Sequence, residues 1–175
     1  RIYLPGVPLP VDIYNSHMNA RGASKVPEKR NLEAHRRQVA MASAFIADTS
    51  DDDLALIFGG DFNMRHSEAR WEGFSEYHPL DLVHKYCVEE PDRCEVKLSW
   101  DGDAPWMDTQ DLQFFSDGQK MQIRPVAVQA MFDGGDGGPR LSDHDGYKVR
   151  YEIQWDAAME QDRAARDMVR SYCLK

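Results

Sequence analysis

The feature that most constrains this chain is an apolar run that ends in a short polar loop, because it recurs in distant parts of the sequence. Residues 54–58 lead into Gly59-Gly60-Asp61-Phe62-Asn63, and residues 11–14 lead into Asn15-Ser16-His17-Met18-Asn19-Ala20. A further polar turn near the end reads Leu141-Ser142-Asp143-His144-Asp145-Gly146. Loops at strand ends are where a rigid scaffold holds functional side chains. We therefore expect these segments to assemble one polar site.

A fourth segment lies between Asn63 and Leu141 in the sequence. It runs from Met107 to Gly118 and contains Asp111-Leu112-Gln113-Phe114-Phe115. The order N-x-H-M-N-A, G-G-D-F-N, an acidic residue opening an aromatic strand, and S-D-H-D-G resembles the endonuclease/exonuclease/phosphatase superfamily, whose fold is that of deoxyribonuclease I. G-D-F-N alone is a weak signal. The resemblance covers most of residues 11–155 and rests on four elements in the family's order.

The resemblance implies an α/β (α+β) fold, a deoxyribonuclease I-like αββα sandwich of two mostly antiparallel sheets flanked by helices. Residues 1–155 are expected to form its C-terminal part, and residues 156–175 an amphipathic C-terminal helix. The N-terminal half of the family domain carries a metal-binding glutamate in an L-Q-E-like motif, and no segment of this sequence matches it. We therefore expect either a piece of a longer enzyme or a chain that needs a complementing half.

The resemblance also assigns roles. Asp61 would orient or deprotonate the attacking water, and Asn63 would donate to phosphoryl oxygens. His17 would bind phosphate. His144, with Asp111 held against it, would be a general base or a phosphate-stabilising cation. Substrate contacts are expected from two further residues, Asn15 and Arg65, and Asp143 would help to hold the metal.

The residue chemistry agrees with these roles. Hydrolysis of a phosphoester needs charge neutralisation at the phosphoryl oxygens, which a divalent cation supplies as a Lewis acid. Carboxylates without sulfur ligands suit Mg²⁺, or alternatively Mn²⁺. A carboxylate such as Asp111 beside His144 would favour the imidazolium and raise the pKa of His144.

Each candidate also has a structural alternative. Asp61, Asn63, Asp143 and His144 are residue types that commonly form or cap turns. Arg65 is equally well read as a surface charge, and Asp108 is the alternative to Asp111. The remaining histidines are expected on helix surfaces or in loops: His35, His66, His78 and His84.

Composition narrows the class of protein. A chain of 175 residues is long enough to bury the core of one domain. No apolar run approaches the roughly 20 residues of a membrane helix. The net charge of −9 argues against a broad nucleic-acid-binding surface, since nonspecific affinity comes from Lys and Arg. Cys87 and Cys94 either form a small disulfide loop, which would favour an exported, oxidising compartment, or are two ordinary thiols.

The pattern predicts several elements. Strands are expected at 1–4, 11–14, 54–58, 112–115, 123–128 and 147–155, and helices at 28–47, 66–74 and 79–88, the last opened by Pro79. Asp117-Gly118 predicts a hairpin joining two of the strands, and residues 133–139 a glycine-rich loop.

The function expected is divalent-metal-dependent phosphoester hydrolysis, most readily of a phosphodiester. The substrate is expected to be nucleic acid, a phospholipid headgroup or a small phosphoester. The alternative is a non-catalytic fragment or pseudoenzyme that binds phosphate-bearing ligands or a complementing chain.

Overall fold

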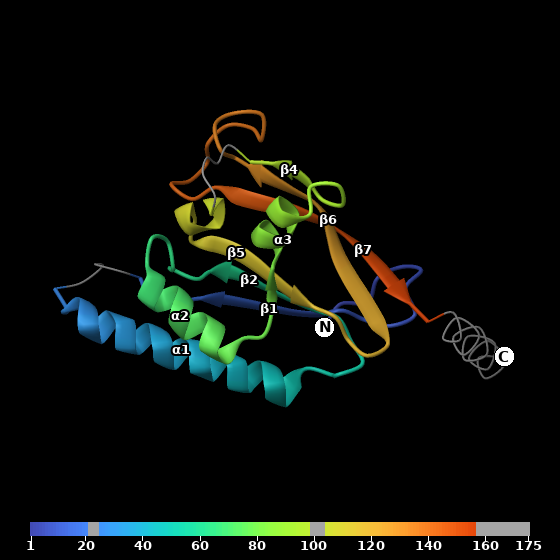
Figure 1. The fold of residues 1–175 in the computed structure, drawn as a ribbon, viewed down its shortest axis with the longest axis horizontal. Helices are drawn as coiled ribbons and strands as arrows, with labels where there is room; N and C mark the ends of the chain where they lie inside the picture. Colours follow the sequence, from blue (N-terminus) through green and yellow to red (C-terminus); the bar gives the residue numbers. More distant parts are fainter. Residues whose placement is uncertain (21–24, 99–103, 157–175) are drawn as a thin grey trace, which may run out of the picture.

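A computed structural model describes residues 1–20, 25–98 and 104–156, which form two sheets with helices outside them (Figure 1). The first sheet has the order β1-β2-β5-β3. Its strands are Asp12–His17, Leu56–Asp61, Asp111–Ser116 and the short β3, Asp81–Leu82. The second sheet has the order β4-β6-β7, with strands Glu95–Lys97, Met121–Met131 and Gly146–Trp155. Pairings β1–β2 and β4–β6 are parallel, and the other three are antiparallel.

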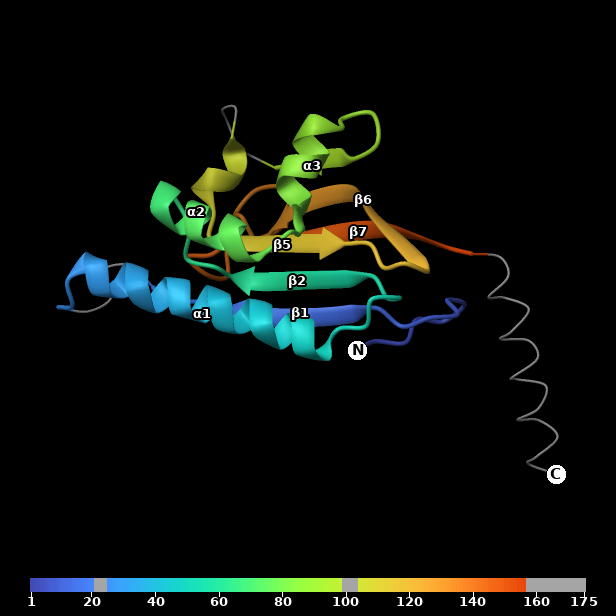
Figure 2. The same ribbon diagram turned by 60° about the horizontal axis from the view of Figure 1, so that its bottom comes forward.

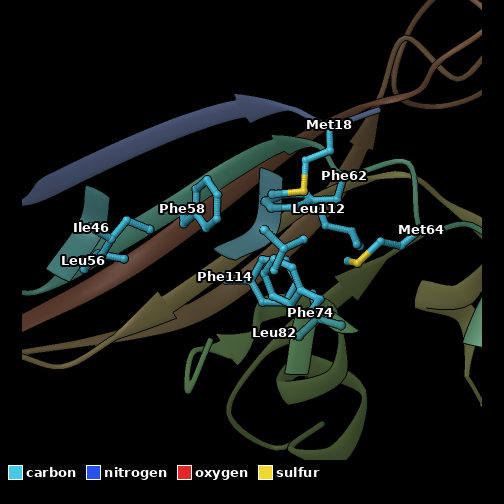
Figure 3. Close-up of a cluster of buried hydrophobic side chains, with 11 residues drawn as sticks. Met18, Ile46, Leu56, Phe58, Phe62, Met64, Phe74, Leu82, Leu112 and Phe114 are labelled. Atoms are coloured by element: carbon cyan, nitrogen blue, oxygen red, sulfur yellow. The ribbon is translucent and has the colours of Figure 1, made fainter. Parts of the chain in front are cut away.

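Helices α1 (Glu28–Thr49) and α2 (Glu68–Tyr77) cover one face of the first sheet. Even-numbered residues of β2 and β5 point to this face because side chains alternate along a strand. Val39 and Ile46 of α1 join them in one core, together with Phe74 of α2. Figure 3 shows most of this cluster, in which Phe62 and Phe114 have ring centroids 5.0 Å apart.

The odd-numbered residues of the first sheet face the second sheet. Ile57 and Phe115 pack there with Ile123 and Val128 of β6. Helix α3 (Val83–Glu89) closes this inter-sheet core and lies away from α1 in Figure 2. A disulfide between Cys87 and Cys94 ties α3 to the turn before β4, so of the two alternatives left open by the sequence the disulfide loop is the one present.

The expected hairpin at Asp117-Gly118 is wrong, since β5 and β6 belong to different sheets. The turn instead packs on the loop before β2. The backbone N–H of Gln119 donates to Asp52, and a Cβ on Gly118 would lie 2.4 Å from the Leu54 backbone. The turn therefore carries the chain from one sheet to the other.

Other helix and strand boundaries differ from those expected from the sequence, because contacts with distant segments set them. The helix expected from Pro79 starts at Val83, because Asp81 and Leu82 first pair with β5. The strand expected at 1–4 is reduced to a single bridge between Ile2 and Val11. Strand β4 and a 3-10 turn at Pro105–Asp108 were not predicted. The C-terminal helix expected at 156–175 lies outside the described residues beyond Asp156.

Three of the histidines expected on the surface are buried. His35 and His84 are 0% exposed and His78 is 6% exposed, whereas His66 is exposed in its loop. Burial lowers the pKa of all three, that of His84 to about 3. They therefore belong to the neutral interior of the fold.

The chain is thus a mixed α/β structure of two sheets flanked by helices, as the sequence predicted. Among the described residues, no helix is both long and apolar enough to cross a membrane.

Candidate active site

Three polar side chains lie in one row across the first sheet. The parallel register sets His17 of β1 beside Asp61 of β2, and the antiparallel register sets Asp61 beside Asp111 of β5. Residues opposite one another in neighbouring strands project to the same face. This row lies at the end of the inner face, beyond an apolar row formed by Ile13, Ile57 and Phe115.

Gly60 makes the close approach of β1 and β2 possible. Its φ of +145° lies in a region that L side chains rarely adopt, and an added Cβ would lie 1.9 Å from the carbonyl oxygen of Ser16. Beyond it, the backbone N–H of Met18 donates to the carbonyl of Asp61 at 2.8 Å. Glycine at position 60 therefore lets the strands carry His17 and Asp61 side by side.

His144 comes from the loop before β7 and meets this row. Its Nδ1 lies 2.7 Å from Oδ2 of Asp111 and 3.9 Å from Oδ2 of Asp61. Nε2 of His17 lies 3.4 Å from the same oxygen of Asp61. Two carboxylates and two imidazoles from distant parts of the sequence are thus within direct interaction range.

Electrostatics favours a charged His144. Partial burial lowers its pKa, but the charge and hydrogen bond of Asp111, with the charges of Asp61 and Asp143, outweigh burial and raise it. Burial raises the pKa of Asp111, and the nearby His144 opposes that shift. The pair therefore holds a proton on the imidazole to a higher pH than a free histidine would.

Asn63 is buried, and its side chain serves the backbone. Its Nδ2 donates to the carbonyl of Met18 at 2.9 Å, and its backbone N–H donates to Oδ1 of Asp61 at 2.9 Å. Its φ of +52° lies in the left-handed region, which asparagine tolerates better than most residues. Here Asn63 links the two strand-end loops, and its contact with a phosphoryl oxygen stays a prediction.

The remaining predicted residues line two neighbouring hollows. Asp143 and Arg65 border a polar cavity of about 520 Å³ together with Asp111 and His144. Asn15 borders an adjacent hollow of about 410 Å³ between the sheets and donates to the carbonyl of Gly59 at 3.2 Å. Asp108, the alternative to Asp111, lies at the cavity wall and pairs with His66 at 3.3 Å. Asp111, not Asp108, is the residue that touches His144.

Several solved structures are similar to this chain. An endonuclease/exonuclease/phosphatase family protein from Bacteroides thetaiotaomicron is 16% identical, with a TM-score of 0.49 over 83% of this chain and 49% of that one. Beta toxin from Staphylococcus aureus, a mutant with bound magnesium ions, is 14% identical, with a TM-score of 0.49 over 81% and 49%. Sphingomyelinase C from Streptomyces griseocarneus is 12% identical, with a TM-score of 0.47 over 83% and 52%.

The chain matches endonuclease/exonuclease/phosphatase structures. It spans about half the length of the structures it matches. No protein-family model matches the sequence, and no curated protein matches it.

A metal ion would find suitable donors in this site. Asp61, Asp111 and His144 offer ligand atoms that all lie within 4.8 Å of one another. In the part of the chain that the structure describes, this is the one group of three or more such residues, and Asp143 is outside it. Two carboxylates fit a hard divalent cation, which prefers oxygen ligands.

Two further polar contacts were not predicted from the sequence. The side-chain amide of Gln110 lies 2.9 Å from Nε2 of His144, so both imidazole nitrogens have partners. Arg140 pairs with Asp145 at 2.9 Å on the same cavity wall. Gln110 immediately precedes Asp111, and that adjacency was the available signal. Arg140 lies at the end of a glycine-rich loop and carried no signal.

Proposed function

We propose that this chain carries catalytic residues of a divalent-metal-dependent phosphoester hydrolase, acting most readily on a phosphodiester, in which water attacks phosphorus. The observation that carries the proposal is the row of His17, Asp61 and Asp111 with His144 bonded to it. A metal site alone would not require two imidazoles beside two carboxylates. A site that binds phosphate and transfers protons uses both groups.

Bound Mg²⁺ or Mn²⁺ would supply Lewis-acid neutralisation of the phosphoryl charge and would be held by Asp61 and Asp111, with Asp143 of the neighbouring loop as a further candidate ligand. Asp61 is suited to orient the attacking water. Its Oδ1 is occupied by the backbone N–H of Asn63, which leaves Oδ2 directed toward the imidazoles. The Asp61 carboxylate is thereby fixed before substrate arrives.

The raised pKa of His144 favours a role as a phosphate-stabilising cation over that of a general base. Gln110 can hydrogen-bond to His144 in either protonation state of the imidazole, because a glutamine amide presents both N–H donors and a carbonyl acceptor. The side chain of His17 is 75% exposed and can turn toward a phosphate. Arg65 stands at the cavity wall as a candidate contact to the rest of the substrate.

The cavity and the charge of the chain bear on the substrate. A hollow of about 520 Å³ is in the range of small-molecule sites, roughly 300–1,000 Å³. The net charge of −9 disfavours a broad nucleic-acid surface. We therefore place a phospholipid headgroup or a small phosphoester ahead of nucleic acid.

The test is hydrolysis of bis-(p-nitrophenyl) phosphate with Mg²⁺ or Mn²⁺, beside an EDTA control. We expect His144→Ala to lose about 10²–10⁴-fold in rate, the usual contribution of such a group. Arg93→Ala is the control, because Arg93 is 74% exposed, pairs with Glu90 and is not among the residues that line the cavity. Turnover that survives both EDTA and His144→Ala would contradict the proposal.

A second candidate is a non-catalytic domain that binds phosphate-bearing ligands or a complementing chain. The observation in its favour is that β1 and β7 each have one neighbour among the described strands. Beside β1, Ile13, Met41 and Phe45 are 43%, 71% and 60% exposed around a hollow of about 500 Å³. Open edges and exposed apolar groups favour association. A folded sample without turnover that regains activity with an added N-terminal half would assign this surface to that half.

A further inference from the structure

Arg70 is a fully buried arginine close to the strand-end loops. It lies in the first turn of α2, and its side chain is 0% exposed. A guanidinium stays charged in proteins, so its burial is unfavourable unless several acceptors surround it. Its carboxylate neighbour Glu28 is 3.5 Å away and 59% exposed, which makes that pair loose. The closer partners of Arg70 are therefore informative.

Those partners are two backbone carbonyls in different loops. Nη1 of Arg70 donates to the carbonyl of Asn19, in the loop after β1, and to that of Asn63 at 3.1 Å, in the loop after β2. Asn19 lies two residues after His17, and Asn63 lies two residues after Asp61. One nitrogen atom therefore joins the segments that leave the two strands.

Arg70 belongs to a group of buried side chains that donate hydrogen bonds to the backbone carbonyls of these two loops. The carbonyl of Met18 accepts from Asn63, and the carbonyl of Phe62 accepts from Nε2 of buried His35 at 2.8 Å. With the two bonds of Arg70 included, two adjacent backbone carbonyls in each loop accept hydrogen bonds from side chains: those of residues 18 and 19 after β1, and those of residues 62 and 63 after β2. Beyond the last paired residues of β1 and β2, these loop carbonyls therefore bond to side chains of α1, α2 and the loop itself, in place of a neighbouring strand.

We infer that Arg70 is a positioning residue, which sets His17 and Asp61 at their separation by holding the carbonyls of Asn19 and Asn63 together. The inference rests on the proposed hydrolysis for its catalytic consequence. The bonds that carry it go to the carbonyls of Asn19 and Asn63, each two residues beyond His17 or Asp61. A displacement of about 1 Å in such groups can lower a rate about 10²-fold.

The first measurement is steady-state kinetics of Arg70→Met, which keeps most of the side-chain length and removes the donors. We expect kcat to fall about 10–100-fold with KM changed less than about threefold. Arg70→Lys should recover part of the loss, since one ammonium can still reach a carbonyl. The control is Arg37→Met on α1, whose side chain is 74% exposed and paired with Glu33.

A double-mutant cycle distinguishes positioning from general stability. If Arg70 acts through His17, Arg70→Met should lower kcat much less in a His17→Ala background than in the native chain. A merely structural role would give equal losses in both backgrounds. Equal losses, or an Arg70→Met enzyme with native kcat, would overturn the inference.

A second measurement does not depend on activity, so failure of the proposed function can be told apart from failure of this inference. Amide hydrogen exchange of Arg70→Met should speed up at Met18 and Asn63, whose N–H groups bond to Asp61. Amides of the paired strands β6 and β7 should keep native protection. Unchanged exchange at Met18 and Asn63, or a uniform increase over the chain, would refute the positioning role.

Discussion

At the scale of single residues, the contact between His144 and Asp111 joins the C-terminal loop to the sheet. Nδ1 and Oδ2 lie 2.7 Å apart, and the pair borders the polar cavity. The family resemblance implied this contact. The participation of Gln110 on the opposite nitrogen could not be predicted, because nothing in the sequence distinguishes a glutamine that bonds to an imidazole from one that faces water.

The first prediction concerns protonation of His144 in the metal-free chain. Its pKa lies above the ordinary 6.5, so the favourable interaction is fully present below pH 6.5 and is lost as pH rises through the folded pKa. Asp111→Asn should move that pKa down toward or below 6.5. An NMR titration of the His144 ring in EDTA measures it. A native-like pKa in Asp111→Asn would show that Asp111 is not the group that raises it.

The second prediction concerns Gly60. Gly60→Ala should lower the free energy of unfolding by about 2–4 kcal/mol, because the added Cβ meets the Ser16 carbonyl and the backbone is strained. Urea unfolding measures the loss. Gly6→Ala is the matched control. Gly6 also has a positive φ, +81°, but has open space around it, so we expect a loss of only about 1 kcal/mol there. Equal losses would attribute the effect to φ alone.

At the scale of elements, sequence patterns predicted the long α1 and the strands beside the site, and failed where distant contacts choose the outcome. Asp117-Gly118 has the composition of a hairpin turn. What overrides it is the packing of this turn on residues 52–54, a contact between segments over 60 positions apart that local composition cannot encode. The two-residue β3 exists only through β5, and it was missed for the same reason.

The disulfide carries the third prediction. Replacing Cys87 and Cys94 together by alanine should lower the free energy of unfolding by about 2–3 kcal/mol, the entropy of a short closed loop in the unfolded chain. Both residues are buried, so some loss of packing is included. Chemical denaturation with and without reductant measures the effect. Reductant should destabilise the native chain and leave the double variant unchanged, and a native chain insensitive to complete reduction would contradict the prediction.

At the scale of the whole molecule, the sheet order and the helical layer agree with the fold that the four motifs predicted. The residues forming the row could be named from the sequence, because His17 and Asp61 were expected at the ends of two strands and the family resemblance pointed to Asp111 at the start of another. The polar layer behind that row could not. Arg70 and His35 lie at helical positions where composition predicts surface residues, and their burial follows from the carbonyls that the loops leave unpaired.

The three buried histidines give the fourth prediction. His35, His78 and His84 have lowered pKa values, so the unfolded chain takes up protons near pH 6.5 that the folded chain does not. The contribution of these three histidines should therefore be full above pH 6.5 and fall as pH decreases below it, by up to about 1.4 kcal/mol per pH unit for each histidine. His144, whose pKa is raised, changes in the opposite sense and loses its contribution as pH rises through its folded pKa. Asp111, whose pKa is raised, partly opposes this trend at lower pH.

Urea unfolding between pH 7.5 and 4.5 measures that slope. His84→Gln removes one titrating group and should reduce the slope by about one proton's worth, roughly 1.4 kcal/mol per pH unit. A native chain whose stability is flat from pH 7.5 to 4.5 would show that the buried histidines take up protons without unfolding.

Because His17, Asp61 and Asp111 occupy one row of the sheet, the spacing between its strands fixes the distance between their backbone positions. Neighbouring strands lie about 4.8 Å apart, and between β1 and β2 this approach requires the glycine at position 60. Point substitutions in the row thus change its chemistry and leave its spacing alone. Insertions or deletions act oppositely: one residue removed from β2 turns Asp61 into the aromatic core and brings a core residue to the row. The site can therefore accept substitutions that change its donor groups, but not insertions or deletions in the strands that carry it.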